Sequence, residues 1–157
     1  MHDGDVLAAI AARIDQVKDA IGLRGVSYPA LNTVPASPWL MVRQSVAIPS
    51  RVTKERAGLQ VVHLSIDAVL LVTSDAKRPS DAARLDGLGY QILDLFDANA
   101  NGGNVNNAFA GLLAEPVDRI WSAAPVRRMA LEWGEAGYCH AAILTLDAEY
   151  KRRASLP

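Results

Sequence analysis

Residues 97–102, with the sequence DANANG, place side-chain oxygens at alternate positions before a glycine. This spacing matches the first half of an EF-hand loop, in which such oxygens bind a calcium ion. The second half is missing, because Val105 occupies position nine and Ala108 replaces the glutamate expected at position twelve. We therefore interpret the segment as a turn that ends a helix, and we expect no metal there. Asn101 and Asn104 remain candidates for contacts with a neighbouring chain.

His63, Cys139 and His140 are the side chains that could bind a soft metal or pair a nucleophile with a base. Cys139 and His140 are consecutive in a predicted strand and therefore point to opposite faces, so a shared metal site is not expected. No Cys-His motif surrounds the thiol, which we interpret as a small buried residue. His140 is expected at the edge of the core and His63 against a neighbour.

The remaining polar patterns also have structural interpretations. A set of carboxylates recurs along one predicted helix and is typical of a solvated face: Asp81, Asp86, Asp94 and Asp97. Gly87 and Gly89 lie inside that helix and do not form a phosphate loop. Each costs about 1 kcal/mol relative to alanine, which indicates that another segment approaches closely. We expect neither an enzyme nor a cofactor.

Basic residues gather in three places, which are Arg51 with Lys54 and Arg56, Arg127 with Arg128, and residues 151–153. For the first group, a salt-dependent contact with phosphate or with an acidic partner is one interpretation, and a solvated turn is the other. No aromatic residues alternate with these cations, so a protein that binds single strands is not indicated.

Composition limits the class of protein. The chain has 157 residues, a formal net charge of −1 and one cysteine. This length suits a single domain, residues 1–157, and the charge excludes a global basic field. The lone cysteine excludes an internal disulfide, and no apolar run reaches the roughly 18 residues of a membrane span. We expect a soluble protein without membrane contact, made in the cytoplasm.

Periodicity predicts the elements that position these residues. Apolar spacing predicts an amphipathic helix over 3–21 and a second helix that begins at Ser80. Between and after them we expect strands over 39–44, 59–73, 117–124, 126–133 and 138–150, a polar arm over 45–58, and helical turns over 108–114. This order predicts an α+β fold, a mixed and mainly antiparallel sheet with both amphipathic helices packed on one face.

The strand predicted over residues 59–73 is unusually long, since it would span roughly 50 Å at about 3.3 Å per residue. Its even positions from Val62 to Val72 are all apolar, whereas its odd positions include His63, Ser65 and Asp67. One face therefore packs on a core, and the other is only partly polar. We interpret the odd face as part of a subunit interface, with these three residues as candidates.

The whole layout resembles the tail-terminator or minor tail (head-tail joining) proteins of long-tailed bacteriophages. The resemblance covers nearly all of the chain and consists of the helix DVLAAIAARI, Tyr28 with Pro29, the strand PWLMV, the long strand LQVVHLSIDAVLLVT, a helix rich in Asp, Ala and Leu, and the closing strand YCHAAILTLDAEY. A head-completion or other neck protein has much the same layout, and a small enzyme or small-molecule module is a further alternative.

The resemblance implies a structural virion protein without catalytic residues. Such proteins form a ring, commonly of six copies, that caps the tail tube, ends its polymerisation and joins the tail to the head at the tail-neck junction. The implied partners are further copies of the chain, the tail tube protein and head-tail connector proteins, and double-stranded DNA passes the lumen without being read. In this interpretation the 45–58 arm, with Arg51, Lys54 and Arg56, and the 97–107 loop supply contacts.

Overall fold

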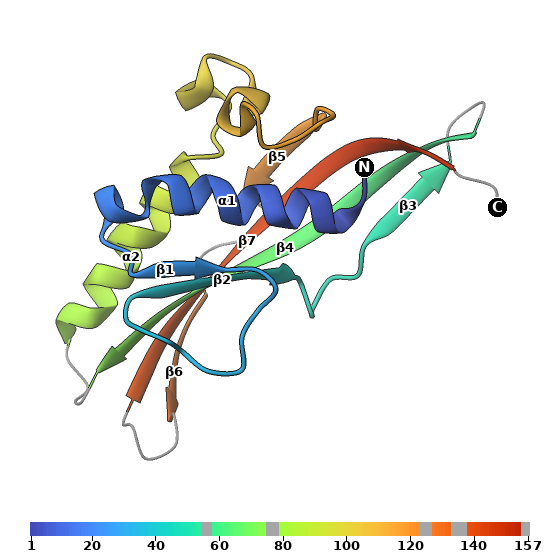
Figure 1. Ribbon diagram of the computed structural model, residues 1–157. Helices are drawn as coiled ribbons and strands as arrows, with labels where there is room; N and C mark the ends of the chain where they lie inside the picture. The colour runs from blue at the N-terminus through green and yellow to red at the C-terminus, as the bar shows by residue number, and fades with distance from the viewer. Residues whose placement is uncertain (55–57, 75–78, 123–126, 133–137, 155–157) are drawn as a thin grey trace.

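The computed structural model describes residues 1–54, 58–74, 79–122, 127–132 and 138–154. The elements, in chain order, are α1 (Asp3–Ile21), β1 (Gly25–Ser27), β2 (Trp39–Gln44), β3 (Arg51–Lys54), β4 (Leu59–Ser74), α2 (Pro79–Asp94), the short helices η2 (Asn99–Asn101) and η3 (Val105–Phe109), β5 (Arg119–Ser122), β6 (Arg127–Glu132) and β7 (Tyr138–Arg153). The predicted α+β class is confirmed (Figure 1). No helix among the described residues is long and apolar enough to cross a membrane.

Two long strands form the centre of the sheet. β4 and β7 have 16 residues each and pair antiparallel without a break, from Leu59 opposite Arg153 to Ser74 opposite Tyr138. The described strands follow the order β1-β2-β4-β7-β5, with β3 added to β4 and β6 added to β7. Every pairing is antiparallel except that of β1 with β2. The predicted mixed, mainly antiparallel sheet is therefore confirmed.

The core lies between the helices and one face of this sheet. The even positions of β4, among them Leu64, Ile66 and Leu70, are almost fully buried and form one cluster with apolar residues of both helices. Alternate residues of a strand point to opposite faces, so both helices pack on the same face, as predicted. A smaller cluster on the opposite face contains Met41 and Leu71.

Helix α1 is attached to the sheet by a polar contact as well as by its apolar stripe. The Tyr150 hydroxyl of β7 donates a hydrogen bond to Asp3 in the first turn of α1. Tyr150 is fully buried, and burial, followed by the adjacent carboxyl of Asp3, raises its pKa above the usual value for tyrosine. The helix ends at Gly22, whose positive φ of 80° suits a glycine.

Four features differ from the sequence-based expectations. The short parallel strand β1 was not predicted, because three residues carry too little periodicity to detect. The arm expected over 45–58 contains the edge strand β3, and the closing strand continues beyond Tyr150 to Arg153. β5 begins at Arg119, two residues later than the strand expected over 117–124, whose last two residues lie outside the described part of the chain.

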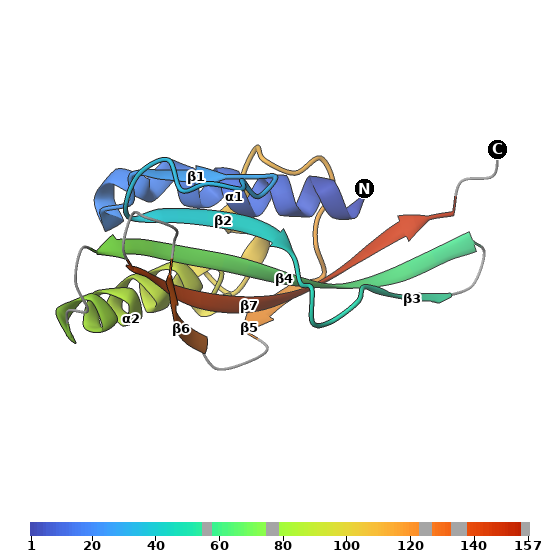
Figure 2. The ribbon, with the colours of Figure 1, turned by 90° about the horizontal axis from the view of Figure 1, so that it is seen from below.

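One end of the sheet extends beyond the helices. There β3, the beginning of β4 and the end of β7 continue past the N-terminal end of α1, as Figure 2 shows at the right of the view. We call these described segments, residues 51–54, 58–61 and 151–154, the arm. Its outer end is closed by a hydrogen bond from the Ala154 amide to the Gly58 carbonyl. The arm places charged residues away from the main core.

Candidate functional site

A row of four charged or polar residues crosses the sheet on the face opposite the helices. Strand register places Arg51 opposite His63, His63 opposite Glu149, and Glu149 opposite Arg119. One oxygen of Glu149, Oε2, lies 3.1 Å from His63 Nδ1 and also 3.1 Å from Arg119 Nη2. Residues directly opposite one another in an antiparallel pair lie on the same face. The row therefore joins β3, β4, β7 and β5 around a single carboxylate.

The next row towards the middle of the sheet contains Ser65, Asp147 and Trp121. The Ser65 hydroxyl donates a hydrogen bond to the Asp147 carboxylate. The guanidinium of Arg119 lies over the Trp121 ring, 4.4 Å from its centre. This stacking connects the two rows, since Arg119 contacts Glu149 in one row and the tryptophan in the next.

The third row buries a carboxylate completely. Asp67 is 0% exposed and accepts a hydrogen bond of 3.4 Å from Thr145. Its other oxygen lies 3.7 Å from Nη2 of Arg43, which is opposite it in β2. Within the described part of the chain, neither Asp67 Oδ2 nor Arg43 Nε has a hydrogen-bond partner. Burial of a charge with so few hydrogen bonds is costly, so this pair constrains the strands more than it stabilises them.

Arg51 and His63 of the first row, together with all three residues of the second, line a groove of about 420 Å³. Its lining residues are Ile48, Pro49, Arg51, Thr53, His63, Ser65, Trp121 and Asp147. Three predicted interface residues, Arg51, His63 and Ser65, are thus brought together in one place. Ser65 and Asp67 are also buried and hydrogen-bonded within the chain, so of the three predicted odd-face residues of β4 only His63 is half-exposed.

The other candidates lie elsewhere. Arg56 lies outside the described residues, and for Lys54 the structure gives only its backbone, paired with Gln60. Asn101 and Asn104 belong to the connection after α2, on the helix side of the molecule, where the neighbouring Val105 is part of the main core. They are therefore not part of the groove.

The 97–102 loop is held by its own hydrogen bonds, as expected for a turn. Asp97 Oδ1 accepts from the Asn99 amide, and the Asn101 side chain donates to the carbonyls of Leu95 and Asp97. Gly102 follows with a φ of 71°. In the described residues, no group of three or more His, Cys, Asp or Glu side chains could hold a metal ion. Cys139 is fully buried, and burial raises the pKa of its thiol.

Sequence reasoning missed Trp121, Arg119 and Glu149 as parts of one site. The signal was available in part, because Asp147 and Glu149 stand at alternate positions of the closing strand and were therefore predicted to lie on one face of it. What was lacking was the register, which pairs Glu149 with His63 and with Arg119. A pattern in one strand does not reveal which residue of another strand lies opposite it.

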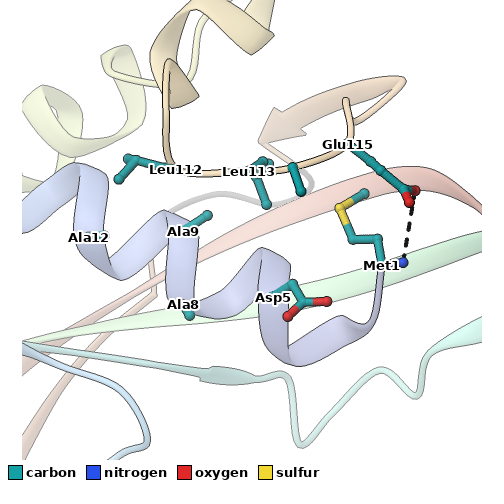
Figure 3. Close-up of a pocket in the computed structure, with 9 residues that line it drawn as sticks. Met1, Asp5, Ala8, Ala9, Ala12, Leu112, Leu113 and Glu115 are labelled. Atoms are coloured by element: carbon teal, nitrogen blue, oxygen red, sulfur yellow. Dashed lines mark ion pairs between the residues drawn. The ribbon is translucent and has the colours of Figure 1, made fainter.

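A second hollow, of about 470 Å³, lies beside α1 (Figure 3). Ala8, Ala9 and Ala12 of the helix line it together with Leu112 and Leu113, and Ala9 lies on the side of the helix towards Leu113. At its rim the Met1 amino group lies 3.8 Å from the Glu115 carboxylate. The lining is mainly apolar, and its charged groups are the carboxylates of Asp5 and Glu115 and the amino group of Met1.

Comparison with known proteins gives a distant likeness to solved structures. No protein-family model and no curated protein sequence matches the chain. Among solved structures, the chain is similar to one in a structure described as the virion of a native gene transfer agent particle. The two chains share 11% sequence identity, the alignment covers 94% of each, and the TM-score is 0.48.

Proposed function

We propose that this chain is a structural protein of a phage-like virion. In this proposal it forms a ring of six copies at the end of the tail tube, at the tail-neck junction, where it ends tail polymerisation and joins the tail to the head connector. The arm is the observation that carries the proposal, because it extends strand edges and exposed side chains beyond the subunit's own core. The resemblance to tail-terminator proteins, found in the sequence, points to the same function.

The region of β3 has the properties of a contact surface. Val46, Ile48 and Val52 have exposed fractions of 80%, 36% and 52%, and all three belong to β3 or to the connection that leads into it. Among the described strands β3 pairs with β4 alone, so its outer edge is open to a further strand. An exposed apolar patch next to an open edge is typical of a surface that another chain covers.

A ring also requires a second, different patch on each subunit. The opposite margin of the sheet supplies a candidate, since among the described strands β5 pairs with β7 alone and carries Arg119 and Trp121 beside the groove. A heterologous contact between the β3 margin of one copy and the β5 margin of the next would repeat around a closed ring.

The assembly function is tested by removing the three basic side chains predicted to make contacts in the 45–58 segment. Replacing Arg51, Lys54 and Arg56 with serine should leave the circular dichroism spectrum unchanged and impair tail completion. The matched control replaces the exposed arginines Arg24, Arg84 and Arg127, and should complete tails normally. Normal infectivity of the variant with Arg51, Lys54 and Arg56 replaced would refute this role of the 45–58 segment.

Particles that lack the protein test the specific role at the tail end. Overlong tails without heads in electron micrographs are expected if the protein ends polymerisation. Filled heads without tails, accompanied by free tails of normal length, would instead indicate a head-completion protein. Normal particles would refute both functions.

A further inference from the structure

We propose that the arm binds the phosphate backbone of double-stranded DNA without reading its sequence. The residues responsible are Lys151 and Arg153 at the end of β7, together with Arg51 of β3 and Arg152. Arg51 is shared with the proposed contact between copies, but the DNA binding is measured on the isolated protein with variants of residues 151–153, so its failure is distinguishable from failure of the proposed ring.

Strand register brings the cations together from distant parts of the chain. Arg153 lies opposite Leu59, Lys151 opposite Val61, and Arg51 opposite His63. All three therefore lie on the odd face of β4, the face away from the helices. Lys151 and Arg153 are two positions apart, which separates them by about 7 Å along the strand.

These side chains are available to a ligand. Arg51, Lys151 and Arg153 are exposed, and the ion pairs found among the described residues do not involve them. The carboxylate next to them in the ladder, Glu149, already contacts His63 and Arg119. Arg152 is half-buried and donates through Nε to the neutral Gln60 amide, so its charge is not neutralised there.

A hollow at the base of the arm is lined in part by these cations. It measures about 440 Å³ and is lined by Met1, His2, Leu59, Glu115 and residues 151–153. A protein with a net charge of −1 thus carries a local basic end on a narrow extension. Cations on both faces of that extension suit an elongated polyanion that passes alongside it more than a flat acidic patch on a folded protein.

Salt dependence makes the proposal quantitative. Each phosphate that a cation neutralises contributes about −0.9 to the slope of log K against log salt concentration. With four cations engaged, the slope for a 30-base-pair duplex is expected to be about −3.6, which is a loss of about 150-fold between 50 and 200 mM salt. Unrelated sequences of equal length should bind equally, because the contacts are to phosphate.

The experiment measures fluorescence anisotropy of that duplex with the full chain and two matched variants. The arm variant carries Lys151→Gln, Arg152→Gln and Arg153→Gln, and its slope should be shallower by about 3. The control variant carries Arg24→Gln, Arg84→Gln and Arg127→Gln, with the same change in net charge at exposed positions elsewhere, and should bind like the parent.

Three results would overturn the proposal: no salt-dependent binding by the parent, equal weakening in both variants, or competition by polyglutamate as effective as that by unlabelled duplex. The last would indicate an acidic protein partner. If the triple variant fails to fold, the double variant Lys151→Gln with Arg153→Gln removes only exposed side chains. Its slope should be shallower by about 2, and an unchanged slope in a folded double variant would refute the assignment.

Discussion

Two glycines of α2 provide a matched test of how closely this helix approaches the sheet. Both lie inside the helix, where alanine is favoured over glycine by about 1 kcal/mol. A Cβ atom at Gly87 would meet nothing within 4 Å, whereas at Gly89 it would lie 3.1 Å from Leu144 Cδ2. Gly87 is exposed, while Gly89 and Leu144 are buried. The substitutions therefore share the effect on helix propensity and differ in crowding.

We expect Gly87→Ala to increase the free energy of unfolding by about 0.5–1 kcal/mol. Gly89→Ala gains the same propensity, but Leu144 is fully buried and must move, and overpacking of this kind costs about 1–3 kcal/mol. Its net effect should range from no gain to a loss of about 2 kcal/mol. For a chain of this length, 1 kcal/mol corresponds to a shift in Tm of about 2–4 °C.

Urea denaturation followed by far-UV circular dichroism measures both variants, with equal m values as the check that only stability has changed. A Leu144→Val background isolates the contact, because it removes the Cδ2 atom that a new Cβ would meet. In that background Gly89→Ala should become as favourable as Gly87→Ala. Equal stabilisation by both substitutions in the parent chain would refute the close approach of α2 to β7.

Two further predictions concern the packing of α1 and β1. Gly25→Ala would place a Cβ 2.2 Å from the Trp39 ring, which is held in place because its Nε1 donates a hydrogen bond to Ser27. We therefore expect the free energy of unfolding, measured by urea denaturation, to fall by about 1–3 kcal/mol. A fall of less than about 0.5 kcal/mol would contradict this packing. Tyr150→Phe removes the hydrogen bond to Asp3 and should cost about 1–3 kcal/mol at pH 7. The pKa of Tyr150 is raised by burial and by Asp3, so above about pH 10 the hydroxyl loses its proton in the unfolded chain before it does in the folded chain. The free energy of unfolding of the parent therefore falls with rising pH, by up to about 1.4 kcal/mol per pH unit through this group. The phenylalanine variant lacks this contribution, and equal pH dependence of the two proteins between pH 10 and 11 would contradict the assignment.

Much of the fold could be predicted because it rests on local patterns. The stripe of α1 and the alternation in β4 and β7 each need only neighbouring residues, and their bounds in the structure are close to those predicted. The close approach at Gly89 was also indicated by the cost of a glycine inside a helix. β1 escaped prediction because its position depends on Trp39 packing over Gly25, a contact between strands.

The candidate site could be predicted only in part, for the same reason. Arg51 and His63 were singled out individually, and the register places them opposite one another. Glu149 and Arg119 complete the row through pairings that span long stretches of chain, which periodicity does not contain. Asp67 was expected on a partly polar face, and the structure buries it under contacts from Arg43 and Thr145.

The uninterrupted pairing of β4 with β7 has a consequence for how the chain reaches its folded state. Ser65 and Asp147, which meet in this ladder, are 82 residues apart, so the pairing is almost entirely non-local. Loop closure must precede the favourable contacts, and such topologies fold slowly. On the ribosome, β4 emerges well before β7, so the edge of β4 that pairs with β7 has no partner strand until the chain is nearly complete. The long strand that forms the sheet is therefore also the segment most in need of protection from aggregation during synthesis.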